Sequence, residues 1–235
     1  MTAKTAVITG ASGNLGKAVV KKFIDNDYKV WGTERSNSGK NNSKKNEQAN
    51  ERFNEVSLDL LNDDACREWI DSVVNNSQQI DVAVLTAGGF AMGDIAKTKS
   101  SDIAKQYHLN FETAYNIARP VFIQMLKQNN GRIFLIGSRQ GLDILKGKDS
   151  LSYSLSKSLL FRLAEVMNAE AKGNNIVVSV IVPGIIDTLP NRESMPDADY
   201  SSWVSPSQIA DVIYFYSSEE GSVIREPVIK VYGKS

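Results

Sequence analysis

The sequence predicts an α/β fold, a doubly wound parallel sheet of about seven strands with helices on both faces. Short runs of β-branched and aliphatic residues recur along the chain, as is typical of strands buried on both sides. Longer stretches with apolar residues at helical spacing separate these runs. A glycine-rich turn follows the first run, where such folds join a strand to a helix.

The elements follow one another in strand–helix alternation. The expected strands cover residues 5–9, 28–33, 53–58, 80–86, 133–136, 176–182 and 228–232. The expected helices cover residues 15–24, 63–74, 101–128, 151–172 and 206–217, with Pro120 expected to kink or divide the longest one. The polar stretch 36–50 is rich in Asn, Ser and Lys and is interpreted as a mobile loop. No repeat or linker divides the chain, so residues 1–235 are expected to form a single domain.

Composition argues against several classes of protein. Lys plus Arg and Asp plus Glu number 27 each, so no overall charge favours nucleic acid or an anionic membrane. The one cysteine, Cys66, excludes an internal disulfide and argues against a metal cluster. Met1 leads directly into the first strand without the pattern of a leader peptide, and no apolar run has the length of a membrane span. We therefore expect a soluble, cytoplasmic protein without a metal.

The turn after the first strand fits a dinucleotide. Glycines permit a tight turn, close approach of the backbone to a pyrophosphate and close helix–strand packing, and the next helix directs its N–H groups at the phosphates. An ordinary strand-to-helix turn is the alternative. The amphipathic helix that follows favours a Rossmann-type cofactor site. The expected contacts of this turn are Gly10, Ser12, Gly13, Asn14, Leu15 and Gly16.

The second strand ends in two residues that favour different cofactors. Glu34 can accept hydrogen bonds from ribose hydroxyls, which favours NAD(H) and repels a 2′-phosphate. Arg35 is a good phosphate ligand, and the lysines at 40, 44 and 45 could add to it. NAD(H) is favoured, and NADP(H) stays open. Asp59 and Leu60, which close the third strand, are expected to meet the adenine.

Four polar residues form the expected catalytic set. Tyr153 and Lys157 are four residues apart, which places both on one face of a helix. An unperturbed phenol has a pKa near 10, and a neighbouring ammonium lowers that pKa toward the working range. Ser138 follows the fifth strand and can donate a hydrogen bond to a substrate oxygen. Asn110 is an unfavoured residue in a helix, so it is expected to have a buried partner such as a water molecule.

The ordered set of these motifs resembles the short-chain dehydrogenase/reductase family over essentially the whole chain. The matching residues are the glycine turn, Thr86-Ala87-Gly88-Gly89, Asn110, Ser138, Tyr153 with Lys157, and Pro183-Gly184. The resemblance implies a nicotinamide-dependent oxidoreductase that transfers a hydride to or from a carbonyl or alcohol substrate. It also implies a homodimer or homotetramer that acts on a small molecule.

The resemblance further implies a role for each matching residue. Tyr153 would be the general acid/base, and Lys157 would bind the ribose and modify the tyrosine pKa. Ser138 would orient the carbonyl, and Asn110 would hold a proton-relay water. The remaining implied cofactor contacts are Ala87, Gly88, Gly89, Pro183, Gly184, Ile186 and Thr188, the last two beside the nicotinamide.

Two segments resemble dihydropteridine reductase more closely, namely 87–93 and 191–203. That enzyme reduces a quinonoid dihydropterin and lacks the catalytic serine, whereas this chain has Ser138. Pterin reduction is therefore an alternative function. Phe90, Met92 and Trp203 lie in loops at the carboxyl edge of the sheet and are expected in the substrate pocket.

A non-catalytic protein that senses NAD(P) is the alternative from a different class. A sensor has no chemical need for a proton donor, so the serine, tyrosine, lysine and asparagine set argues for an enzyme. His108, the only histidine, and Cys66 are not expected to take part in chemistry.

Overall fold

The computed structural model describes residues 3–35 and 51–234, so the predicted loop at 36–50, with its lysines, lies outside the described residues. In the described part of the chain, seven strands form one parallel sheet in the order β3-β2-β1-β4-β5-β6-β7. The order reverses between β1 and β4, and this switch point is where open α/β sheets bind ligands. The strands are β1 (Thr5–Thr9), β2 (Lys29–Arg35), β3 (Phe53–Leu58), β4 (Val82–Leu85), β5 (Asn130–Ile136), β6 (Asn175–Pro183) and β7 (Val228–Val231).

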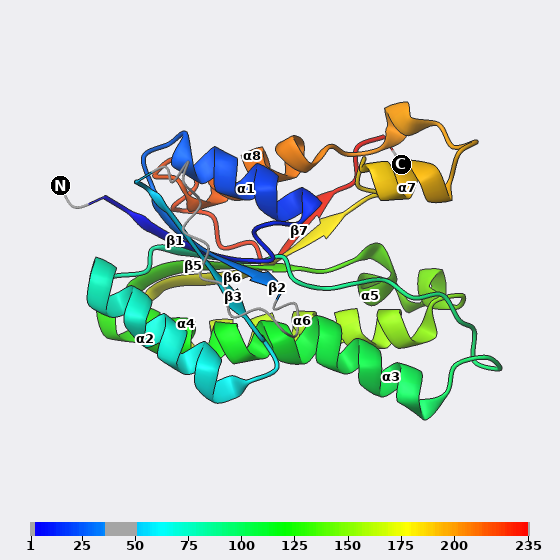
Figure 1. Cartoon of the computed structure of the whole chain (residues 1–235), viewed down its shortest axis with the longest axis horizontal. Helices are drawn as coiled ribbons and strands as arrows, with labels where there is room; N and C mark the ends of the chain where they lie inside the picture. The colour runs from blue at the N-terminus through cyan, green and yellow to red at the C-terminus, as the bar shows by residue number, and fades with distance from the viewer. Residues whose placement is uncertain (1–2, 36–50, 235) are drawn as a thin grey trace.

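Helices cover both faces of the sheet (Figure 1). The first face carries α1 (Asn14–Ile24) and α8 (Pro206–Ser217), which pack against each other. The second face carries α2 (Asp63–Ser77), α4 (Thr113–Gln128) and α6 (Leu151–Glu170). The predicted α/β architecture, with helices on both faces of a parallel sheet, is confirmed.

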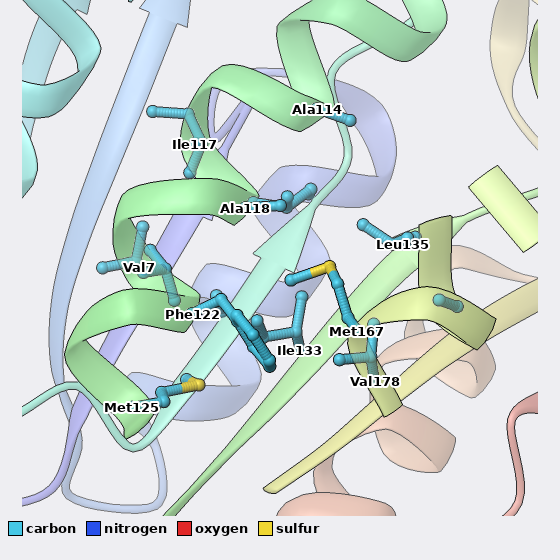
Figure 2. Close-up of a cluster of buried hydrophobic side chains, with 14 of the residues drawn as sticks. Val7, Ala114, Ile117, Ala118, Phe122, Met125, Ile133, Leu135, Met167 and Val178 are labelled. Carbon is cyan, nitrogen blue, oxygen red and sulfur yellow. The ribbon is translucent and has the colours of Figure 1, made fainter. Parts of the chain in front are cut away.

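Each face encloses its own apolar core. Figure 2 shows part of the core on the second face, where Ile117 and Phe122 of α4 lie against the sheet near Val7 and Ile133. These side chains are at most 5% exposed. Burial of such a side chain contributes about 1.5–3 kcal/mol, so the core holds the strand ends in fixed relative positions.

The long predicted helix is interrupted, but not at proline. It consists of α3 (Ser100–Tyr107), a π-helical turn (His108–Glu112) and α4. Pro120 lies inside α4, which continues through it, so the expectation that it divides the helix was wrong. Proline removes one helical hydrogen bond, and the buried neighbours Ala118 and Val121 keep α4 packed on the sheet.

The sequence pattern missed the short helical segments at the carboxyl edge of the sheet. These are α5 (Arg139–Leu142), a 3₁₀ turn (Ile144–Gly147), α7 (Leu189–Ser194) and a second 3₁₀ turn (Tyr200–Ser202). Segments this short carry too little periodicity to be recognised. None of the helices in the described part of the chain is long and apolar enough to cross a membrane.

Candidate functional site

The carboxyl ends of β1 and β4 are joined by side-chain hydrogen bonds. The Thr86 hydroxyl donates to the Thr9 carbonyl over 2.6 Å. The Ala87 amide donates to the Thr9 hydroxyl over 3.3 Å. These bonds hold the glycine turn beside Ala87, at the switch point of the sheet.

The glycine turn leaves no room for side chains at two of its positions. Gly10 has φ +63°, and a Cβ there would lie 3.0 Å from the Thr86 hydroxyl. A Cβ on Gly16 would lie 2.0 Å from the Gly10 carbonyl oxygen, so α1 packs directly on the turn. Gly13 caps α1 without a side-chain hydrogen bond, so its first N–H groups face no capping oxygen. Such a helix end favours an anion.

The other residues of the turn differ in exposure. Ser12 and Asn14 are exposed at the start of α1. Leu15 is 9% exposed and belongs to the core under α1. Only its backbone is therefore available to a ligand.

The carboxyl end of β2 carries two charged side chains in different settings. Glu34 is half-buried. On the neighbouring strand β3, burial of Glu55 is the main cause that raises the pKa of Glu55, and the negative charge of Glu34 is the second. Arg35 is exposed and lines the cavity described below. The pair thus places an acidic side chain and an exposed guanidinium next to each other at the end of β2.

The turn after β3 is held by a helix residue that the sequence analysis did not single out. Asn116 of α4 is 5% exposed and donates a hydrogen bond to the Leu60 carbonyl over 2.9 Å. Asp59 accepts the Leu61 amide over 3.0 Å. An Asn inside a helix is the signal that drew attention to Asn110, and the same signal could have found Asn116.

Asn110 lies in the π-helical turn and is fully buried. Its Oδ1 accepts the Gly89 amide over 2.9 Å, and its Nδ2 lies 3.0 Å from the Gly89 carbonyl. Nδ2 also lies 2.8 Å from Gln106 Oε1 and 3.1 Å from Ser156 Oγ. The side chain therefore braces the turn after β4 against α6.

Gly88 lies where three site elements converge. A Cβ on Gly88 would be 2.6 Å from Asn110 Oδ1 and 3.3 Å from Lys157 Nζ. The turn after β4 therefore packs directly on both side chains. Any larger residue at this position would displace one of them.

Ser138 and Tyr153 face each other across the end of β5. Ser138 is 4% exposed and caps α5, and its Oγ accepts the Gly141 amide over 3.0 Å. Burial raises the pKa of Tyr153, and the neighbouring Ser138 hydroxyl partly offsets that rise. A serine hydroxyl has one hydrogen and two lone pairs, so Ser138 can accept the Gly141 amide and still donate its O–H to a neighbouring acceptor.

Lys157 is 5% exposed, and its ammonium donates to the Ile136 carbonyl over 2.7 Å. Burial lowers the pKa of Lys157 to about 8. The expected lowering of the Tyr153 pKa is not what this structure has, because desolvation of the phenol is the largest cause and acts upward. The ammonium is directed at the end of β5, between the turn after β4 and α6.

A cavity of about 750 Å³ adjoins this set. Phe90 and Met92 line it, together with Arg35 and with Ser152, the residue before Tyr153. Trp203 is not among its lining residues. It is 7% exposed and packs on Tyr200, with ring centroids 4.8 Å apart.

The segment after β6 is held in place by backbone hydrogen bonds and a helix cap. Gly184 directly follows Pro183, and its amide donates a hydrogen bond to the Val231 carbonyl of β7 over 2.8 Å. Ile186 pairs with Val204 in an isolated bridge. Thr188 caps α7, where its hydroxyl accepts the Asn191 amide. These residues all follow the carboxyl end of β6, on the same edge as Ser138.

The two remaining side chains that the sequence analysis named, His108 and Cys66, have contacts of their own. His108 is exposed and contacts Glu112. Cys66 is buried, which raises the pKa of its thiol to about 12. In residues 3–35 and 51–234 no cluster of His, Cys, Asp and Glu could hold a metal ion.

Comparison with known proteins agrees with this arrangement. A family model for short chain dehydrogenase matches residues 4–199. The chain is 28% identical over 239 residues to the 3-oxoacyl-(acyl-carrier-protein) reductase FabG of Buchnera aphidicola subsp. Acyrthosiphon pisum, covering 98% of this chain and 96% of that protein. It is 26% identical over 243 residues to the acetoacetyl-CoA reductase of Acinetobacter sp., with the same coverage.

A solved structure described as ElxO with NADP bound has the same fold. Its TM-score is 0.87 at 25% identity, and the match covers 98% of both chains. The family match spans most of the chain and includes the glycine turn, Asn110, Ser138, Tyr153 and Lys157. The chain is a member of the short-chain dehydrogenase family and an oxidoreductase that uses a nicotinamide cofactor.

Proposed function

We propose that this protein is a carbonyl reductase in which Tyr153 exchanges a proton with the substrate oxygen. The observation that carries the proposal is the convergence of Ser138, Tyr153 and Lys157 at the end of β5, beside the cavity lined by Phe90 and Met92. A nicotinamide cofactor supplies or accepts the hydride when bound. Ser138 donates a hydrogen bond to the substrate oxygen, whose charge changes during the reaction.

The glycine turn fits the pyrophosphate of such a cofactor. A Cβ at Gly16 would collide with the Gly10 carbonyl. The start of α1 therefore packs directly on the turn, as the dinucleotide-binding motif requires. The first N–H groups of α1 would hold the phosphates through Ser12, Gly13 and Asn14. Lys157 would hold the ribose, because its ammonium already lies against the turns that flank the site.

The other cofactor contacts follow from the strand ends. Asp59 and Leu60 would border the adenine, with Asn116 holding Leu60 in place. Ile186 and Thr188 would border the nicotinamide. The remaining backbone contacts would come from Ala87, Gly88, Gly89, Pro183 and Gly184.

The identity of the cofactor depends on Glu34 and Arg35. Glu34 and Glu55 together make a negative edge that repels a 2′-phosphate, which supports NAD(H). The exposed Arg35 supports some use of NADP(H), the cofactor form bound in ElxO. Glu34→Ala should raise the relative use of the phosphorylated cofactor, as measured by kcat/KM for the two cofactors. A wild type that strongly prefers NADPH would refute the assignment to Glu34.

The relatives favour carbonyl reduction over the two alternatives. Their names describe reductases of 3-oxoacyl and acetoacetyl thioesters, which carry a ketone. A pterin reductase would not need the Ser138 hydroxyl, and a sensor would not need Tyr153. The proposed substrate is a ketone, with 3-oxoacyl thioesters as the first compounds to test.

We also propose a homodimer or homotetramer. Tyr115 and Ile123 of α4 and Leu155 and Val166 of α6 are 39–63% exposed, which leaves apolar side chains on both helices open to a second copy. Light scattering after size exclusion tests this. A monomer at micromolar concentration would refute it.

The function is tested by following NADH and NADPH oxidation with 3-oxoacyl thioesters, simple ketones, quinones and quinonoid dihydropterin. Turnover of a ketone and its loss in Ser138→Ala support carbonyl reduction. Turnover of the dihydropterin alone, with Ser138→Ala still active, would support the pterin alternative instead. Tight cofactor binding without turnover of any compound would favour a sensor.

A further inference from the structure

The segment between β4 and α3 is anchored at both ends to the start of α6. At one end the Asn110 side chain holds both backbone groups of Gly89 and lies 3.1 Å from Ser156 Oγ of α6. At the other end the Gly93 amide donates to the Asp149 carbonyl over 2.8 Å. The Leu151 amide, at the first residue of α6, donates to the Gly93 carbonyl over 2.8 Å. The residues between the two glycines therefore keep a fixed place relative to α6.

Phe90 occupies this anchored segment and contacts Tyr153. The two ring centroids are 4.9 Å apart and the ring planes meet at 75°, the edge-to-face arrangement that aromatic pairs prefer. Phe90 is 57% exposed, so it is not held there by burial in a core. Phe90 also lines the cavity.

The phenol of Tyr153 thus has two neighbours that limit its rotation. The Ser138 hydroxyl neighbours its phenol oxygen, and Phe90 packs on its ring. A neighbour at the oxygen alone still lets the ring turn. Contact with the ring as well limits the orientations that the side chain can take.

We propose that Phe90 is a positioning residue for Tyr153, holding the phenol ring so that its hydroxyl stays directed at Ser138 and the substrate oxygen. This inference rests on the proposed acid/base role of Tyr153. It assigns Phe90 a function in turnover, in addition to the expected contact with substrate. A misplaced proton donor slows the chemical step, so the effect falls on kcat.

The expected loss follows from the strength of the ring pair. An aromatic pair contributes about 0.5–1.5 kcal/mol beyond its buried area, so loss of orientation should reduce kcat about 2- to 12-fold. Phe90→Ala should show this loss with KM changed less than kcat. Phe90→Tyr keeps the ring and should retain kcat. Phe90→Leu keeps apolar bulk without a ring and should lie between them.

Ile95→Ala is the matched control, because Ile95 is in the same segment, is 80% exposed and does not line the cavity. It should keep the wild-type kcat. If Phe90→Ala retains kcat and raises only KM, Phe90 is a substrate contact and the inference is wrong. If Phe90→Tyr fails to restore kcat, the ring contact does not position Tyr153.

A second measurement does not depend on turnover. Nitration of tyrosines by tetranitromethane, located by peptide mass spectrometry, reports how accessible each phenol is. Phe90→Ala should nitrate Tyr153 several-fold faster than wild type, with Ile95→Ala unchanged. Equal nitration rates would refute the contact itself. Faster nitration with a kcat that is also insensitive to Tyr153→Phe would show that the acid/base assignment, and not the contact, is at fault.

Discussion

Lys157→Met should stabilise the protein at neutral pH while it damages the proposed site. Lys157 is 5% exposed, and burial lowers its pKa from 10.5 to about 8. At about 1.4 kcal/mol per pKa unit, keeping this ammonium charged inside the fold costs about 3 kcal/mol. Methionine matches the length of the side chain without the charge. It leaves the Ile136 carbonyl without its 2.7 Å donor, which costs about 1–3 kcal/mol.

The expected net gain at neutral pH is therefore about 1 kcal/mol, and it depends on pH. Below pH 8 the folded protein carries the disfavoured charge, so the penalty is present in full. Between about pH 8 and 10.5 the folded state loses this proton before the unfolded state does, so wild-type stability rises relative to the variant. Above that range both states are neutral and the penalty disappears.

Urea unfolding at several pH values measures this difference. Burial also raises the pKa values of Tyr28 and Cys66, but it does so equally in the wild type and in the variant. Subtracting the stability of one protein from that of the other therefore removes their contribution. Lys172→Met, at an exposed lysine, is the control and should show neither effect. A variant that is less stable by more than about 1 kcal/mol, or a difference that does not change with pH, would refute the reasoning.

Three further substitutions test individual contacts of the structure. Gly16→Ala should abolish dinucleotide binding in a calorimetric titration, because its Cβ would lie 2.0 Å from the Gly10 carbonyl oxygen, and unchanged affinity would contradict the assignment. Asn110→Leu should lower the free energy of unfolding by at least about 2 kcal/mol, because it leaves both Gly89 backbone groups unpaired, and a smaller loss in urea unfolding would argue against the brace. Arg192→Ala should leave the midpoint of thermal unfolding nearly unchanged despite two short bonds to Asp187, because solvent screens that surface pair, and a clear drop in the midpoint would refute this expectation.

Hydrophobic patterning was sufficient to predict the sheet. The strands at 5–9 and 53–58 match β1 and β3. β1 is buried along its whole length, as is typical of central parallel strands, whereas β3 lies at the sheet edge and is only half-buried. The long helix was predicted correctly in extent, but its interruption was placed at Pro120. Local rules identify proline as a helix breaker. The interruption is instead the π-helical turn that carries Asn110, whose side chain pairs with Gly89, 21 residues earlier in the chain.

The candidate site shows the same division between local and tertiary information. Gly10 and Gly16 follow from backbone sterics and could be predicted from the turn alone. Asn116, which holds Leu60, and the anchoring of Gly93 to the residues before α6 depend on tertiary contacts that no local pattern contains. The spacing between Tyr153 and Lys157 alone predicted a lowered pKa for the tyrosine. Its direction depends on burial, which spacing does not report.

The most direct test of the proposed function compares Tyr153→Phe with the wild type in two assays on the same preparation. Steady-state oxidation of the reduced cofactor with an active ketone measures turnover, and calorimetric titration measures cofactor affinity. Proton transfer by a positioned group contributes about 10²–10⁴-fold, so turnover should fall by at least about 100-fold while cofactor affinity is preserved. Near-normal turnover by Tyr153→Phe with bound cofactor would contradict the assignment of Tyr153 as the general acid/base.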